Sequence, residues 1–319
     1  MAYGSPNSLD EVGDYLAQVR GGRVSSPEEI EHLKQRYQRV GGQTPLLQNT
    51  KSQTNALEKK LIADGIPARV LFGMKHWHPF VEDVVEKISV DNPPILVGLA
   101  LAPHYSKLSI GGYEDSVRRG FARKHSNVPF VMVKSWHTEP SLITALSTRV
   151  GNGVSEMRGS ERTMVVFTAH SLPIGAVSDN DPYQAQLLET SQLVAKEAGV
   201  TEWDFAFQSA SGPTGTWLGP SLKEKISEFS NKGITRILVC PLGFVSDHLE
   251  ILYDLDVEAR GYANSHGIEL ARTLSLNDDP RFIEALAAVT APILVKPMVA
   301  RRGSSPMGCE RIQSNRKVS

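Results

Sequence analysis

Histidines and carboxylates able to handle a metal ion or a proton gather around two points of this chain. His170 follows the apolar run 163–168 and precedes an abrupt turn at Pro173. A side chain at the end of a strand is fixed in direction, which suits a general base. Five more histidines follow predicted strands in the same way: His76, His78, His104, His137 and His248. Taken singly, each such histidine is better explained as a loop or capping histidine with a satisfied hydrogen bond, and only the clustering of several at equivalent strand ends favours a functional role.

Three carboxylates form the second point. Glu250, Asp254 and Glu258 are spaced four residues apart, so they line one face of a predicted helix. Like charges at this spacing cost an isolated helix about 0.2–0.5 kcal/mol per pair, which a divalent cation such as Mg²⁺ or Fe²⁺ would relieve. Two interpretations stay open, a stripe that handles a metal and a solvated acidic face. Asp247, three residues before Glu250, also predicts a capping box at the start of this helix.

Other motifs are weak and exclude several chemistries. The Gly-Asn-Gly sequence at 151–153 lacks a third glycine and follows no strand, so it does not indicate a dinucleotide site. His76 and His78 have no third ligand at the spacing that zinc requires. Two cysteines, Cys240 and Cys309, cannot hold an iron–sulfur cluster with four thiolates, and Cys240 is expected in the core.

Alternating strands and helices must position these groups. The strand candidates are continuously apolar, as expected when helices cover both faces of a parallel sheet. They lie at 68–74, 95–101, 129–134, 163–168, 203–208, 235–240 and 269–273. Ten helix candidates fill the gaps: 9–18, 27–39, 54–63, 79–88, 112–123, 140–150, 181–198, 220–231, 248–264 and 280–289. The pattern predicts an α/β fold with two sheets in two similar halves.

Composition sets the outer limits. The chain has 319 residues, 34 basic and 35 acidic side chains and a formal charge of −1, so no global field attracts nucleic acid. No apolar run approaches the roughly 18 residues of a membrane span, and no signal peptide is visible, so a cytoplasmic protein is expected. We expect a first half at 1–147, a second half at 148–296 whose last helix packs back on the first, and a flexible tail at 297–319.

A series of short motifs stands in order along nearly the whole chain, to about residue 289. They are 1–4 (MAYG), 36–37 (RY) with 41–42 (GG), 75–76 (KH), 101–106 (LAPHYS), 169–173 (AHSLP), 181–183 (DPY), 208–209 (QS), 217–220 (WLGP) and 243–250 (GFVSDHLE). In these motifs the chain resembles the ferrochelatase family, and most closely its short bacterial members that insert iron into coproporphyrin III.

The resemblance implies a chelatase fold, with two Rossmann-like halves that each hold a four-stranded parallel sheet and a porphyrin cleft between them. It implies that His170 and Glu250 are catalytic and handle the iron and the pyrrole protons, with Tyr3 on the opposite porphyrin face. Asp254 and Glu258 match an outer metal site, where Mg²⁺ is a candidate. The positions that match those holding propionates and the porphyrin rim are Arg20, Arg36, Tyr37, Thr44 and Tyr113.

The resemblance also implies substrates and partners and leaves alternative functions open. Fe²⁺ and a porphyrin are the expected substrates, and no organic cofactor is needed. The protein is expected to be a monomer, and its contacts with other haem-pathway enzymes are expected to be transient. The alternatives are use of protoporphyrin IX, insertion of another divalent metal into a related tetrapyrrole, and a haem-binding chaperone without catalysis. Two departures stand out: Met1 falls within the family's first strand, which is therefore expected to be short, and Thr216 replaces a common proline.

Overall fold

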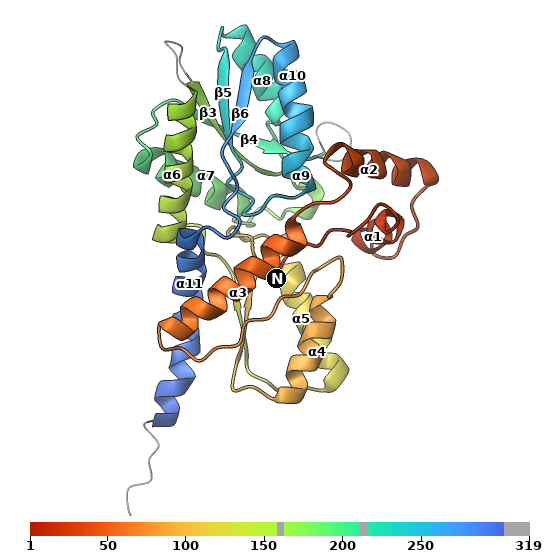
Figure 1. Ribbon diagram of the computed structural model, residues 1–319, viewed down its shortest axis with the longest axis vertical. Coiled ribbons are helices and arrows are strands. Elements are labelled where there is room, and N and C mark those ends of the chain that lie inside the picture. Colours follow the sequence, from red (N-terminus) through yellow and green to blue (C-terminus); the bar gives the residue numbers. More distant parts are fainter. Residues whose placement is uncertain (158–162, 211–215, 303–319) are drawn as a thin grey trace, which may run out of the picture.

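Two parallel sheets form the framework of the protein, as the alternation of strands and helices predicts (Figure 1). The computed structural model describes residues 1–157, 163–210 and 216–302. The smaller sheet pairs β1 (Leu96–Leu99) with β2 (Phe130–Val133). The larger sheet has the order β4-β3-β5-β6 and is parallel throughout. Its strands are β3 (Thr163–His170), β4 (Trp203–Gln208), β5 (Arg236–Cys240) and β6 (Glu269–Arg272).

Helices cover both faces of the larger sheet, which explains its continuously apolar strands. Successive side chains of a strand point to opposite faces. Phe167 of β3 accordingly packs in the same cluster as residues of α6 (Pro140–Glu156) and α7 (Tyr183–Glu197). Its neighbour Val166 packs instead with residues of α8 (Leu222–Asn231) and α10 (Arg260–Ser265). Cys240 is fully buried in the first of these clusters, as predicted.

Most of the remaining helices belong to the first half. The α-helices are α1 (Val12–Val19), α2 (Pro27–Arg39), α3 (Leu46–Ala63), α4 (Val81–Asp91), α5 (Gly112–Lys124) and α9 (Leu249–Leu252). Two π-helices, η1 (Lys107–Gly111) and η3 (Asp254–Ala259), and one 3₁₀ turn, η2 (Ile174–Ala176), complete the order. Figure 1 shows α1 and α2 projecting to one side of the molecule.

The last helix joins the two halves. α11 (Pro280–Arg302) packs against both α3 and α6 and touches β1, so it packs back on the first half. The expectation of a flexible tail from residue 297 is wrong for residues 297–302, because their backbone continues α11. The rest of the expected tail, 303–319, lies outside the described residues. The boundary expected at 147/148 falls inside α6.

The smaller sheet differs from the four strands expected. Met74 makes only isolated parallel bridges, to Ala2 and to Phe80, and residues 68–73 form no strand. Met1 and Ala2 lie between this segment and the end of β1: the Met1 amine donates to the Leu99 carbonyl at 2.7 Å, and the Leu101 amide donates to the Met1 carbonyl at 2.9 Å. Residues 68–73 are not a strand because no strand lies beside them to complete a ladder.

A cavity occupies the place of that neighbour. It has a volume of about 500 Å³ and lies between residues 68–73 on one side and Leu96–Leu99 on the other, with a mainly apolar lining. Met1 borders the cavity, and burial lowers the pKa of its amine to about 5. Because Ala2 is paired with Met74 in parallel, residues placed before Met1 in the same register would run through this cavity.

Filling this cavity should stabilise the protein. We expect an extension of five or six apolar, β-branched residues before Met1 to pair on both sides and bury apolar surface. In a chain of this size each ~1 kcal/mol gained raises the melting temperature by roughly 2 °C, so a rise above roughly 4 °C is expected in calorimetry. Activity through Tyr3 should also improve. A Gly/Ser extension of equal length is the control, and equal melting temperatures for the two would contradict the prediction.

Candidate functional site

The structure brings His170 and Glu250 together. His170 ends β3, and its Nε2 atom lies 3.3 Å from Oε1 of Glu250 in α9. Its other ring nitrogen, Nδ1, donates to the backbone carbonyl of Ser171, which fixes the direction of the ring. Tyr183 donates its hydroxyl to the His170 carbonyl at 3.0 Å. About a third of each side chain of the pair remains exposed, 32% for His170 and 30% for Glu250, so a ligand can reach them.

A glycine allows this approach. Gly243 begins the loop that leads to α9, and a Cβ atom there would lie 2.5 Å from the Cβ of Ala169. No real side chain tolerates that distance, so only glycine lets the loop lie against the end of β3. This contact places the segment with Glu250 next to His170.

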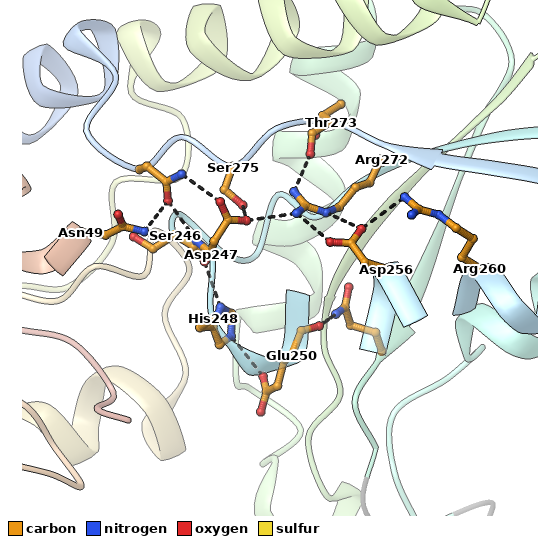
Figure 2. Close-up of polar contacts among 12 residues, drawn as sticks. Asn49, Ser246, Asp247, His248, Glu250, Asp256, Arg260, Arg272, Thr273 and Ser275 are labelled. Atoms are coloured by element: carbon orange, nitrogen blue, oxygen red, sulfur yellow. Dashed lines mark hydrogen bonds and ion pairs between the residues drawn. The ribbon is translucent and has the colours of Figure 1, made fainter. Parts of the chain in front are cut away.

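His248 completes the arrangement, and sequence reasoning did not include it in the site. Its Nε2 atom lies 3.5 Å from Oε2 of Glu250, while its Nδ1 donates to the Ser246 carbonyl at 2.9 Å (Figure 2). The Glu250 carboxylate therefore lies between two imidazoles. The signal was present, because His248 stands two residues before Glu250 at the predicted start of a helix.

His170 and Glu250 each stabilise the charged form of the other. Burial alone would lower the pKa of His170, but the Glu250 carboxylate outweighs it and raises that pKa to about 9. Burial would raise the pKa of Glu250, but His170 and His248 hold it well below its usual value. At neutral pH the pair is thus an imidazolium beside a carboxylate.

The capping box expected at Asp247 and Glu250 is wrong. The N-cap of α9 is His248, which makes no side-chain cap, and the Asp247 carboxylate instead accepts hydrogen bonds from Ser275 and Asn277. Those partners follow β6, far away in the sequence, so tertiary contacts outcompete the local cap.

Cationic side chains of the protein neutralise the rest of the acidic stripe. Asp254 is buried, pairs with Arg36 of α2 and accepts a hydrogen bond from Ser209 at 2.5 Å. Burial raises the pKa of Asp254. Glu258 pairs with Lys223 at 2.8 Å. Within the ranges that the structure describes, no group of three or more histidine, cysteine or acidic side chains is arranged to hold a metal. An outer site at Asp254 and Glu258 thus stays a prediction.

The predicted residues of the first half fall into two groups. Tyr3 is 44% exposed, and its ring centre lies 4.5 Å from that of His76 with the two rings tilted by 50°. Partial burial raises the pKa of Tyr3, and the Glu250 carboxylate adds to the shift. Tyr37 and Tyr113 are instead buried, and burial raises the pKa of Tyr37 to about 12. The hydroxyls of Tyr37 and Thr44 both contact Ser5 Oγ, at 3.1 and 3.0 Å.

Both predicted arginines already have partners. Arg20 pairs with Glu29 at 2.7 Å and donates to Ser25 at 2.9 Å. Arg36 pairs with Asp254 and lies 4.8 Å above the Tyr253 ring, and its buried Nε has no hydrogen-bond partner among the described residues. The same region is held by a small apolar cluster, in which Val12 of α1 and Tyr37 of α2 pack on Leu249. The α1–α2 pair therefore covers the segment that carries Glu250.

Two halves built on parallel sheets give the protein a fold similar to that of chelatases, and its Glu250 carboxylate lies between two histidines, one at the end of β3 and one just before α9. The structure is similar to SirB from Bacillus subtilis solved with Fe³⁺ (TM-score 0.55, 15% identity, 79% of this chain and 91% of that one). It is also similar to CbiX, with a TM-score of 0.52, 12% identity and coverage of 79% of this chain and 95% of that one. At these identities the likeness concerns the fold alone.

Sequence comparison gives the family. The ferrochelatase family model matches residues 1–292, so the chain belongs to the ferrochelatase family. It is 43% identical over 294 residues to a ferrochelatase of Herpetosiphon aurantiacus, covering 91% of this chain and 96% of that protein. It is 37% identical over 297 residues to a coproporphyrin III ferrochelatase of Halalkalibacterium halodurans, with coverage of 91% and 94%.

The ion pair predicts a pH dependence of stability. The pKa of His170 is raised on folding from an ordinary 6.5 to about 9, so the pair's contribution is fully present below about 6.5 and is lost as the pH rises through 9. The difference in unfolding free energy between wild type and Glu250→Gln should therefore shrink as pH rises from about 6 to about 10. Urea unfolding measures it, and a difference that stays constant over this range would contradict the charged pair.

Proposed function

We propose that the protein inserts Fe²⁺ into coproporphyrin III and releases two protons, as a metal chelatase of the lyase class. The observation that carries this proposal is the Glu250 carboxylate between His170 and His248 in a member of the ferrochelatase family. A free-base porphyrin carries two N–H protons where the metal must enter, so the reaction needs proton acceptors beside the place where a cation arrives. One carboxylate flanked by imidazoles provides both.

The charges of the pair suggest how each group acts. Glu250 is ionised and attracts the incoming Fe²⁺. The same carboxylate keeps His170 protonated, so a cation that engages Glu250 withdraws this support and favours loss of the His170 proton. The neutral imidazole can then accept a pyrrole proton. Because Nδ1 is engaged with the Ser171 carbonyl, Nε2 is the atom that receives it.

Other features of the proposal concern the surroundings of this pair. Tyr3 would face the porphyrin from the opposite side, and no organic cofactor takes part. Mg²⁺ at Asp254 and Glu258 would have to displace Arg36 and Lys223, which pair with these carboxylates in the structure. None of the helices in the described ranges has the length and apolar character that crossing a bilayer requires, and we propose a cytoplasmic location.

Coproporphyrin III is the proposed substrate for two reasons. Several relatives at about 37% identity are named coproporphyrin III ferrochelatases. This porphyrin has four propionates, and Arg20 and Arg36 can each bind a carboxylate with paired, charge-assisted hydrogen bonds. In the structure Arg20 pairs with Glu29 and Arg36 with Asp254, so a propionate would compete with these two carboxylates. Hydroxyls of Tyr37, Thr44 and Tyr113 would support the rim.

Substitution of His170 tests the activity. In anaerobic mixtures of protein, coproporphyrin III and Fe²⁺, absorbance spectra should show metallation by the wild type. His170→Ala should lower turnover by about 10²–10⁴-fold, as for loss of a general base, with porphyrin binding largely intact. Residual turnover above about a tenth would remove His170 from the reaction. Wild-type protein that binds haem but metallates no porphyrin would favour a haem-binding chaperone. Faster metallation with Co²⁺ or Ni²⁺ than with Fe²⁺ would favour a chelatase for another metal.

The choice of porphyrin is a separate prediction. Wild-type protein should metallate coproporphyrin III much faster than protoporphyrin IX, without detergent or lipid. Arg20→Gln or Arg36→Gln should narrow this gap, because each removes a cation that binds one of the four propionates. The measurement is kcat/KM for both porphyrins. Equal values in the wild type would refute coproporphyrin specificity and leave the chelatase activity standing.

A further inference from the structure

Arg272 lies outside the histidine–glutamate pair and binds carboxylates on both sides of Glu250 in the sequence, those of Asp247 and Asp256. Arg272 ends β6 and is largely buried, with 11% of its side chain exposed. Its Nε and Nη2 atoms donate to the two carboxylate oxygens of Asp256, each at 2.9 Å (Figure 2). Nη2 also lies 3.2 Å from Oδ1 of Asp247. Asp247 precedes Glu250 by three residues and Asp256 follows it by six.

The Asp247 end of this clamp is fully engaged. Ser275 donates to Oδ1 of Asp247 at 2.8 Å, and Asn277 donates to Oδ2 at 2.9 Å. The Asp247 amide in turn donates to the Asn277 side-chain oxygen at 2.9 Å, and Asn49 of α3 donates to the same oxygen at 2.8 Å. In Figure 2, Ser275 and Arg272 point toward the Asp247 carboxylate. The turn before Glu250 is therefore anchored to the connection after β6.

Local helical structure alone cannot fix the direction of Glu250. α9 has only four residues, its N-cap has no side-chain hydrogen bond, and a π-helix follows almost at once. So short a helix is marginal without tertiary contacts. Among the described residues, Gln208 is the side chain that bonds to the backbone of Glu250, donating to its carbonyl at 2.9 Å. The rest of the constraint must come through the flanking residues.

We propose that Arg272 is a positioning residue, which clamps Asp247 and Asp256 so that the Glu250 carboxylate stays between His170 and His248. Arg272 does not touch Glu250 and acts through the backbone between its two partners. Only a guanidinium suits this task, because it binds one carboxylate with two parallel hydrogen bonds and still reaches a second. The kinetic part of the test rests on the proposed function, and the structural part does not.

The kinetic test compares Arg272→Gln with two matched controls. Arg119→Gln breaks a similar two-bond pair with the buried Glu82, at 3.0 and 2.6 Å, in the first half. Arg260→Gln removes the exposed cation 3.4 Å from Asp256. Displacing a reacting group by about 1 Å can cost up to about 10²-fold in rate, so Arg272→Gln should lower kcat at least about tenfold while KM for the porphyrin stays within about twofold. Both controls should keep kcat within about twofold.

Rescue separates positioning from loss of stability. Millimolar ethylguanidinium should restore a large part of kcat to Arg272→Ala and leave the kcat of Arg119→Ala unchanged. Arg272→Lys, which can pair with only one of the two carboxylates, should fold and give an intermediate kcat; it replaces Arg272→Gln if that variant does not fold. A kcat loss in Arg119→Gln equal to that in Arg272→Gln, at equal loss of melting temperature, would overturn the proposal.

A crystal structure supplies the test that needs no activity. In Arg272→Gln, or in Arg272→Lys if needed, the Glu250–His170 separation should lengthen beyond the 3.3 Å of the wild type, whereas Arg119→Gln should keep it. An unchanged separation in the Arg272 variant would overturn the positioning role. If the wild type metallates no porphyrin, the proposed function fails, and this comparison still decides whether Arg272 positions Glu250.

Discussion

The structure depends on keeping one ionised carboxylate partly buried. Glu250 loses much of its contact with water, which is costly for a charge, and only nearby opposite charge makes its ionised form stable. His170 supplies it from the end of β3, and His248 adds a contact to the other carboxylate oxygen from the residue before α9. Their position requires the close approach at Gly243, the tether from Gln208 and the tyrosine hydroxyl that holds the end of β3. The larger sheet and its loops are thus arranged around the partners of one side chain.

The two halves take different parts in this arrangement. The second half supplies the ionisable pair on a complete four-stranded sheet with helices on both faces. The first half contributes Arg36 of α2 and Gln53 of α3, which contact the second half, and α11 of the second half packs back on α3. Gln53 of α3 donates to Ser246 at 2.7 Å, next to the loop that carries His248. One set of contacts between the halves therefore meets at the segment with Glu250.

The sequence predicts the positions of the strands along the chain better than it predicts which strands and side chains pair. Continuous apolar runs predicted the strands of the larger sheet, because a strand that is buried on both faces needs apolar residues at successive positions and these are visible in the local sequence. The strand expected at 68–74 failed, because a ladder needs a neighbour and a cavity lies there instead. The motif match located His170 and Glu250, which do lie together. It could not show that Arg36 pairs with Asp254, or that Asp247 bonds to residues after β6, since both partners lie far away in sequence.

The partners of the five carboxylates between residues 247 and 258 explain why a cation would engage Glu250 first. Asp247 and Asp256 share Arg272, Asp254 pairs with Arg36, and Glu258 pairs with Lys223. Guanidinium and ammonium groups stay charged at neutral pH, so a metal at those carboxylates must displace a whole side chain. The partners of Glu250 are imidazoles, which can give up a proton and remain in place. On the proposed mechanism, a cation that engages Glu250 would displace a proton from His170 rather than move a side chain, and the neutral imidazole could then take a pyrrole proton.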